Sequence, residues 1–386
     1  MNQQQSFDAP SGSQSGTTGG KSAGTSNASN SANASNAVRH RGHSGPARTS
    51  SVNIRDIAAA AGVSTATVSR VMRGNSKVSD ATREKVQEAI ERLGYVPNAH
   101  ALALTTPPNS VTLVVDHISG GTYSEMTAGV ERETSDRKMM FRIASTGGKW
   151  DEPKPILDDL LSQRPRLAVL TASDVIDDPI DDVLNDYVDK FKSVGTSLVV
   201  LARPRMRLSS EIAVVDYANE SGMYELTKYM ISLGHRRFMF AGLRRNSSVF
   251  MARYHGFLRA LREAGIEFDL RCTIPLDGDR AATIANTMAM FPAVHGCTAV
   301  VAVTDEMALY VIAALRKLGK SVPGDVSVGG FDDMPYAEDL VVPLTTVHAP
   351  FGNMGHMAVK IGLDDFGRDV TMPTQLVVRG SVAPVR

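Results

Sequence analysis

The segment of residues 52–72, VNIRDIAAAAGVSTATVSRVM, constrains the fold of this chain more than any other part of the sequence. A short helix over residues 54–61 and a second helix that begins at Thr65 flank a three-residue turn. Gly62 can adopt the positive φ that so tight a turn requires. The hydroxyl group of Ser64 can accept the free amides at the start of the second helix. The spacing therefore predicts two short helices that cross at a small turn.

Two helices joined in this way form a helix-turn-helix, whose second helix lies in the major groove of DNA. A third helix is predicted between Ser79, a suitable N-cap, and Gly94, which stops it. Its apolar residues Val86, Ile90 and Leu93 recur at helical spacing. The three helices are expected to form one compact unit. From the spacing alone, a helical hairpin with no role in DNA binding remains the alternative.

The distribution of charge agrees with an anion-binding N-terminal part. Residues 1–104 contain 11 Lys or Arg and 6 Asp or Glu, a net charge of +5, and the rest of the chain carries −5. Such a basic end suits a DNA-reading module. The two cysteines, Cys272 and Cys297, belong to no metal-binding pattern, so no metal or cofactor is expected. Neither a transmembrane span nor a signal peptide is recognisable, which predicts a cytoplasmic protein with no membrane partner.

The sequence divides into four predicted parts. Residues 1–50 are rich in small polar residues and predict a disordered tail. Residues 51–97 form the helical headpiece, and residues 98–109 form a hinge helix and linker that ends at two prolines. Residues 110–386 form the core, in which apolar strands alternate with amphipathic helices. This alternation predicts an α/β fold with parallel sheets flanked by helices, arranged as two lobes with a cleft between them. The predicted strands are 112–115, 166–170, 197–202, 238–242, 299–304 and 326–331.

From residue 52 onward the chain resembles the LacI/GalR family of transcriptional regulators. Seven motifs carry the resemblance and occur in the expected order. They are VSxxTVSRV (63–71), TREKVxxAxxxLGYxPN (82–98), LGHRRFMFAG (233–242), RYHGF (253–257), TDEMAL (304–309), VPGDVSVGGFDD (322–333) and PLTTV (343–347). The resemblance implies a helix-turn-helix headpiece, a hinge helix and a two-lobed core like that of periplasmic sugar-binding proteins.

The resemblance also implies a set of DNA-binding residues. Thr65 and Ala66 match positions that face base edges, and their small side chains suit contact with a thymine methyl group. Arg70 matches an arginine that reaches a base, with a phosphate contact as the alternative. Asn98 matches a residue at the start of the hinge, and Leu104 matches the leucine that wedges into the minor groove. Phosphate contacts or helix capping are expected of Ser64, Thr67 and Ser69.

The core contains residues that match ligand-binding positions of the family. Arg253 and Asp305 are expected to face each other across the cleft, where each could grip the hydroxyl groups of a sugar. A structural ion pair is the alternative. In the loop that begins at Ile118, Thr122 and Tyr123 are expected beside the ligand, with Tyr123 as the stacking ring. Arg280 aligns with a position that is often aromatic, which predicts a ligand more polar or more anionic than a plain hexose.

These features predict a sequence-specific DNA-binding regulator, and most simply a repressor of carbohydrate genes that a sugar releases from DNA. Its expected partners are a near-palindromic double-stranded operator, a sugar-type effector and a second copy of the chain. Corepression or activation remains an alternative within the family. A ligand-binding protein with no DNA role is a further class, which the headpiece disfavours. An enzyme is not expected, because no nucleophile, phosphate-loop or metalloprotease motif occurs.

Overall fold

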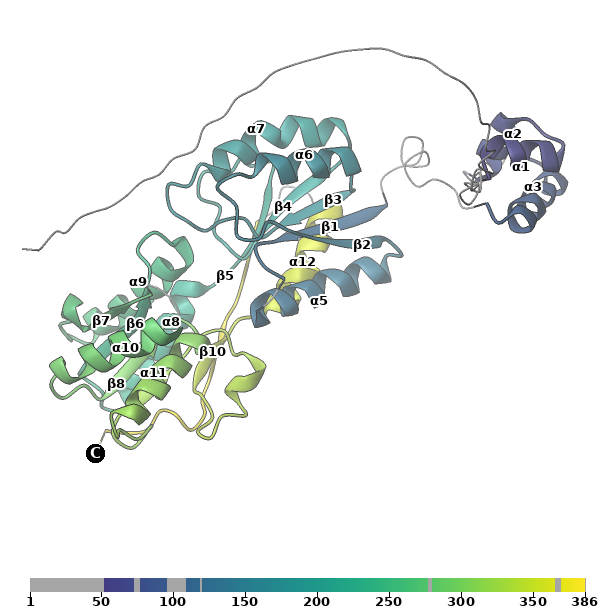
Figure 1. Cartoon of the computed structure of the whole chain (residues 1–386). Coiled ribbons are helices and arrows are strands. Elements are labelled where there is room, and N and C mark those ends of the chain that lie inside the picture. Colours follow the sequence, from purple (N-terminus) through teal and green to yellow (C-terminus); the bar gives the residue numbers. More distant parts are fainter. Residues whose placement is uncertain are drawn as a thin grey trace, which may run out of the picture. The chain divides into compact units, whose positions relative to one another are not determined.

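The computed structural model of the chain (Figure 1) describes residues 52–72, 77–95, 109–118, 120–276, 280–364 and 369–385. The chain divides between residues 95 and 96 into two compact units. The predicted tail and most of the predicted hinge lie outside the described residues. None of the described helices is long and apolar enough to cross a lipid bilayer.

The first unit contains the three predicted helices, α1 (Ile54–Ala61), α2 (Thr65–Met72) and α3 (Asp80–Leu93). Gly62 has φ +66° and ends α1, and the amide of Thr67 donates to the hydroxyl oxygen of Ser64 at the start of α2. Both confirm the turn predicted from sequence. Ser79 precedes α3 as predicted, but its hydroxyl group bonds to the hydroxyl of Thr82 instead of a backbone amide. Ile57, Val68 and Val86, one from each helix, are fully buried at the centre of the unit.

The second unit begins with a lobe built on a six-stranded parallel sheet. The strand order is β11-β5-β4-β3-β1-β2. The strands are β1 (Ser110–Val115), β2 (Met140–Ser145), β3 (Leu167–Leu170), β4 (Ser197–Leu201), β5 (Ala213–Tyr217) and β11 (Val370–Met372). Helices α5 (Gly121–Asp136) and α12 (Phe351–Asp364) pack together on one face of the sheet, and α6 (Lys154–Gln163) and α7 (Ile180–Ser193) cover the other (Figure 1).

Alternation along the strands explains why both faces of this sheet are covered. Leu113 and Val169 point into the core shared with α5 and α12, whereas Val114 and Leu170 point toward α6 and α7. Because successive side chains point to opposite faces, a strand buried on both sides reads as a continuous apolar run. This is the pattern from which the strands were predicted.

The second lobe is built on a four-stranded parallel sheet with the order β7-β6-β8-β9. Its strands are β6 (Phe238–Leu243), β7 (Thr273–Pro275), β8 (Ala299–Ala302) and β9 (Ser327–Gly329). Helix α8 (Asn219–Ser232) packs on α9 (Ser248–Glu263), and α10 (Arg280–Met290) packs on α11 (Asp305–Lys317). Three short 3₁₀ turns complete the lobe: Leu270–Cys272, Phe291–Ala293 and Pro335–Ala337. Cys297 is buried, Cys272 is partly buried, and both are free thiols.

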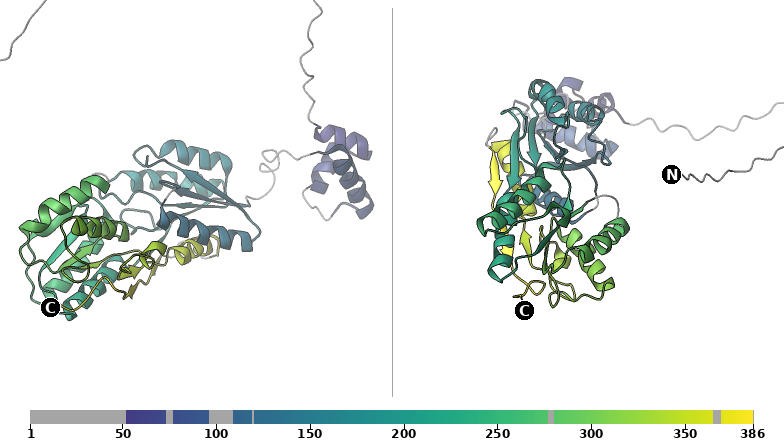
Figure 2. Two further views of the ribbon diagram at one scale, coloured as in Figure 1. Left: turned by 60° about the horizontal axis from the view of Figure 1, so that its bottom comes forward. Right: turned by 90° about the vertical axis from the view of Figure 1, so that its left-hand side faces the viewer.

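The chain crosses between the two lobes at residues 217–219, 348–351 and 372–375. The second crossing leads from β10 (Thr346–His348) into α12, so a late helix completes the first lobe beside α5 (Figures 1 and 2). The third leads from β11 to β12 (Gln375–Val377), which pairs antiparallel with β10. The predicted two-lobed architecture is therefore present.

Candidate ligand-binding and DNA-binding sites

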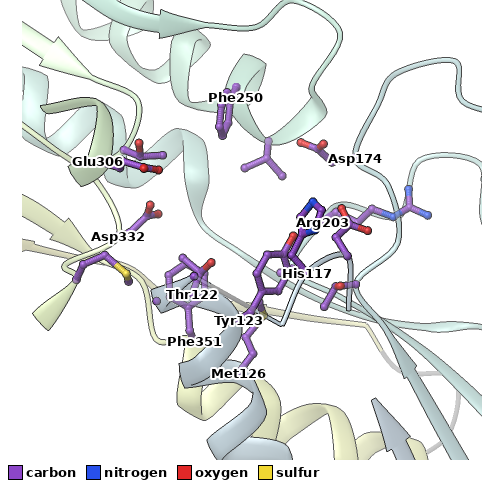
Figure 3. A pocket seen from close by; sticks show the side chains of 18 of the residues that line it. His117, Thr122, Tyr123, Met126, Asp174, Arg203, Phe250, Glu306, Asp332 and Phe351 are labelled. Atoms are coloured by element: carbon purple, nitrogen blue, oxygen red, sulfur yellow. The ribbon is translucent and has the colours of Figure 1, made fainter. Parts of the chain in front are cut away.

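A cavity of about 720 Å³ opens where residues of both lobes meet (Figure 3). Its lining residues follow the carboxyl ends of strands in both sheets, which is where ligands bind in open α/β sheets. From the first lobe they include Asp116, His117, Thr122, Tyr123, Thr171, Asp174 and Arg203. From the second lobe they include Arg244, Phe250, Arg253, Thr304, Glu306, Tyr310, Asp332 and Tyr336. A cavity of this volume holds a small molecule.

Arg253, on α9, is the most extensively bonded charged residue of the cavity wall. Its Nε donates to Oδ1 of Asn219 (2.9 Å), and Nη1 donates to the carbonyl oxygen of Val303 (2.5 Å). Its Nη2 donates to the hydroxyl of Tyr217 (2.8 Å) and to Oδ1 of Asp332 (2.9 Å). The guanidinium group is therefore held in one orientation at the junction of the lobes.

Asp332 supplies the carboxylate beside Arg253. Only 8% of its side chain is exposed, and burial raises its pKa to about 6 although Arg253 acts in the opposite direction. Its backbone has φ +110°, a strained conformation for any residue except glycine. Strain of this kind persists where the surrounding structure enforces it, as at ligand sites. The pair of Arg253 and Asp332 is therefore a preorganised polar group on the cavity wall.

Aromatic rings surround this ion pair. The guanidinium carbon of Arg253 lies 3.8 Å from the ring centre of Phe331 and 5.8 Å from that of Phe250. Phe250 and Tyr123 extend into the cavity from opposite sides (Figure 3). Apolar rings next to a few fixed polar groups are typical of small-molecule sites, and they suit a ligand with both apolar faces and hydroxyl groups.

Thr122 and Tyr123, expected in a loop beside the ligand, line the cavity from the first turn of α5. Burial raises the pKa of Tyr123 to about 12, and the charges of Asp116 and Asp174 contribute to this shift. Asp116 follows β1, and burial raises the pKa of its carboxyl group. This wall of the cavity therefore carries negative charge close to an un-ionised phenol.

Asp174 connects the two lobes beside the cavity. Its carboxylate accepts from Nη2 of Arg244 (2.9 Å) and from the hydroxyl of Ser247, the N-cap of α9. The amide of Ser248 donates to the carbonyl oxygen of Asp174 (2.8 Å), and that of Ile176 donates to Asn246 (2.6 Å). These hydrogen bonds join the two lobes on the side of the cavity where Asp174 lies.

Asp305 was expected to face Arg253, but its contacts in the structure are with other residues. It is fully buried, and it does not line the cavity. Its Oδ1 accepts from the hydroxyl of Thr346 (2.5 Å), and its Oδ2 accepts from the amide of Met334 (2.8 Å). Both carboxylate oxygens of Asp305 thus hold neighbouring segments together, and the carboxylate that pairs with Arg253 is that of Asp332.

Arg280 lies outside the cavity wall as well. It is an exposed residue at the start of α10, and its guanidinium carbon is 5.9 Å from the ring centre of Tyr310, which lines the cavity. Thr304 does line the cavity, but its hydroxyl oxygen caps α11 by accepting from the amide of Met307 (3.1 Å). The structure therefore brings Thr122, Tyr123 and Arg253 together but leaves Arg280 and Asp305 apart from them.

The helix-turn-helix unit presents the other candidate site. Ser64, Thr65, Ala66 and Arg70 are exposed along one side of α2, whereas Val68 and Val71 on the other side are buried. Thr67 and Ser69 are partly buried. The exposed row is available to a groove of DNA. The positions of Asn98 and Leu104 lie outside the described residues.

Several cavity residues were not found by sequence reasoning, although one signal was available. Asp116 follows β1, Arg244 follows β6, and Asp332 comes shortly after β9. Polar residues directly after the carboxyl ends of parallel strands are candidates for ligand contact. Phe250 gave no such signal, because a phenylalanine in a helix usually faces the core.

Comparisons with known proteins agree with this architecture. Residues 53–98 match the bacterial regulatory proteins of the lacI family, and residues 227–382 match the periplasmic binding protein-like domain. The transcriptional regulator CelR of Thermobifida fusca is 32% identical over 328 residues, which cover 83% of this chain and 94% of CelR. The transcriptional repressor PurR of Vibrio vulnificus is 29% identical over 341 residues, which cover 86% of this chain and 99% of PurR.

Solved structures show the same fold. A CelR–cellobiose complex superimposes with a TM-score of 0.62 at 29% identity, covering 86% of this chain and 99% of that one. The lac repressor dimer bound to operator and an anti-inducer gives a TM-score of 0.70 at 23% identity, with the same coverage. With its helix-turn-helix unit, its two-lobed core and these relatives, the chain belongs to the LacI family of DNA-binding transcriptional regulators.

Proposed function

We propose that this regulator is a repressor of carbohydrate-utilisation genes and that a sugar-type effector in the cavity releases it from its operator. The observation that carries the proposal is the fixed pair of Arg253 and Asp332 beside the ring of Phe250 in a 720 Å³ cavity. Charge-assisted hydrogen bonds can grip vicinal hydroxyl groups, and the ring can cover an apolar sugar face. A solved relative, CelR, is a complex with cellobiose.

The proposed DNA contacts are those of the exposed row on α2. Thr65 and Ala66 would contact base edges in the major groove, and Arg70 would reach a base, most naturally a guanine. Ser64, Thr67 and Ser69 would contact phosphates, although the Ser64 and Thr67 hydroxyl groups also bond to each other (2.9 Å). At the hinge, Asn98 would lie near the DNA backbone and Leu104 would enter the minor groove. Their part in binding is proposed from the family resemblance.

A second copy of the chain is the proposed protein partner, because one headpiece reads only half of a near-palindromic site. An exposed apolar surface supports pairing. Ile118 and Ile143 expose 72% and 45% of their surface and line one pocket with residues of α5, and Ile143 lies on β2 at the edge of its sheet. An exposed strand edge with apolar side chains favours association with another chain. We therefore propose a homodimer.

The proposed mechanism couples the cavity to DNA through the arrangement of the lobes. A ligand that contacts residues of both lobes favours one arrangement, and it can change operator affinity only by its difference in affinity for the two. Such coupling is typically about 1–3 kcal/mol, or 5- to 150-fold in affinity. Release by the ligand makes the protein an inducible repressor, whereas tighter binding would make it a corepressed one.

Two measurements on the full chain test the proposal. Genomic DNA fragments are first selected by the protein, and their binding is then measured with and without sugars that raise its melting temperature. We expect one enriched near-palindromic sequence and weaker binding in the presence of a stabilising sugar. Stabilising sugars that leave DNA affinity unchanged would refute the sensing role, and tighter DNA binding would replace induction by corepression.

A further inference from the structure

The three guanidinium groups on the cavity wall are each paired with a carboxylate already. The pairs are Arg203 with Asp181, Arg244 with Asp174 (2.9 Å), and Arg253 with Asp332 (2.9 Å). Pairing cancels most of the positive charge that each arginine would otherwise present to a ligand. A carboxylate or phosphate entering the cavity would therefore meet guanidinium groups whose charge a carboxylate of the protein already balances.

Arg253 is also short of free hydrogen-bond donors. A guanidinium group has five N–H groups, and those of Arg253 make four hydrogen bonds within the protein. Bidentate recognition of a carboxylate requires two parallel N–H groups. Arg253 can offer one N–H group to a hydroxyl oxygen but cannot form the two-pronged contact that an acidic ligand requires.

Within the described part of the chain, two carboxylates on the cavity wall, those of Asp116 and Glu306, have no positively charged partner comparable to these arginines. Asp116 accepts a hydrogen bond from the hydroxyl of Thr146 (3.4 Å), and Glu306 accepts one from the hydroxyl of Tyr310. Among the described residues, neither forms an ion pair with a lysine or arginine. His117, the neighbour of Asp116 in the chain, is the titratable group that can offset its charge.

The two uncompensated carboxylates come from different lobes. Asp116 follows β1 in the first lobe, and Glu306 belongs to the first turn of α11 in the second. Figure 3 shows Glu306 with Asp332 on one side of the cavity and His117 with Asp174 on the other. The pKa of Tyr336 is raised by burial and by nearby carboxylates that include Glu306, so the negative field extends to the second lobe as it does to Tyr123 in the first. A ligand that bridges the lobes would meet negative charge on both sides.

We propose that Asp116 and Glu306 set the charge selectivity of this cavity, so that it accepts uncharged polyhydroxylated ligands and excludes acidic sugars. This inference rests on the proposed sugar-sensing function and names the ligand class of the same site. Hydroxyl groups donate to both carboxylates at no electrostatic cost. An acidic group meets repulsion from both carboxylates, and solvent screens the partly buried Asp116 less than the exposed Glu306.

Matched neutral and acidic sugars provide the test. Binding of glucose and glucuronate, galactose and galacturonate, and cellobiose and cellobiouronate to the full chain is measured by calorimetry and by thermal stabilisation. The titrations are run at pH 8, because burial raises the pKa of Asp116 and its carboxyl group must be ionised in the measurement. The variants are Asp116→Asn, Glu306→Gln and the double variant, with Glu225→Gln on the exposed side of α8 as the control.

For whichever neutral sugar binds, its acidic counterpart is expected to bind at least about tenfold more weakly. The double variant is expected to reduce the ratio of neutral-sugar to acidic-sugar affinity about tenfold, while Glu225→Gln leaves this ratio unchanged. Equal affinity for the two members of a pair in the unmodified protein, or an unchanged ratio in the double variant, overturns the inference. Should the double variant not fold, the ratio in Glu306→Gln decides, since that side chain is exposed. If no sugar binds at all, the proposed function fails first, which is a distinguishable result.

Discussion

A carboxyl group buried as completely as that of Asp305 keeps its proton to a higher pH in the folded protein than in the unfolded chain. Burial raises its pKa to about 7, from an ordinary value of 3.8. The folded state therefore binds more protons between these values, and the resulting stabilisation, complete below pH 3.8, is lost as the pH rises through 7. We expect Asp305→Asn to flatten the fall of the unfolding free energy between pH 4 and 7. Urea titrations at several pH values measure the unfolding free energy. If its slope against pH is the same in Asp305→Asn as in the exposed control Asp136→Asn, the predicted role of Asp305 is excluded.

Arg70 carries the prediction for DNA recognition at the scale of a residue. It is exposed in the last turn of α2, away from the buried Val71. If it reads a guanine, Arg70→Ala loses about 1–3 kcal/mol of discrimination between the operator and variants at one base pair. Fluorescence anisotropy with operator variants measures the loss. An equal fall in affinity for all sequences, with a smaller salt dependence, would assign Arg70 to a phosphate instead.

Single residues also show which parts of the candidate site could not be predicted from the sequence. Arg253 lies on the cavity wall, and its motif and the family resemblance had singled it out; its contact with a ligand stays a prediction. Its carboxylate partner could not be chosen from the sequence, since Asp305 and Asp332 both follow buried strands. The decision depends on which carboxylate is already used by Thr346 and the Met334 amide, and such contacts between distant segments leave no local pattern.

At the scale of elements, α5 and α12 pack closely through glycines. A Cβ atom at Gly355 would lie 2.2 Å from the carbonyl oxygen of Met126, whereas one at Gly352 on the same helix would be 3.7 Å from its nearest neighbour. We expect Gly355→Ala to lose about 1–3 kcal/mol of stability, because α12 must move away from α5. Gly352→Ala should be neutral or stabilising by up to about 1 kcal/mol, because alanine favours a helix. Urea unfolding compares the two, and equal effects would contradict the packing argument.

The elements themselves were predictable to the extent that they carry a periodic pattern. The long apolar strands β1, β3, β4, β6 and β8 lie close to their predicted positions, because burial on both faces makes them continuously apolar. Strand β2 lies at a sheet edge and contains only exposed and partly buried residues, so it gave no such run. Strands β10, β11 and β12 have three residues each, too few for any periodicity.

At the scale of the whole molecule, self-association is expected to depend on the apolar edge of the first lobe. Ile143→Asp places a charge on the exposed face of β2 and should shift the protein from dimer toward monomer in sedimentation equilibrium. Leu270→Asp changes an apolar residue of the second lobe that is more exposed than Ile143 (58% against 45%) and serves as the control. A dimer that survives Ile143→Asp unchanged would exclude this surface, and a stable tetramer would contradict the dimer itself.

A ligand in the cavity is expected to change the affinity of the protein for operator DNA, and one comparison of two proteins measures this coupling. Operator affinity is measured by anisotropy with and without a saturating stabilising sugar, for the unmodified protein and for Asp332→Asn. The substitution keeps an oxygen that accepts from Arg253 but removes the buried charge. We expect operator affinity to change about 5- to 150-fold in the unmodified protein and to change little or not at all in Asp332→Asn, with unliganded DNA binding preserved. A sugar that binds the unmodified protein without altering its operator affinity would exclude this coupling.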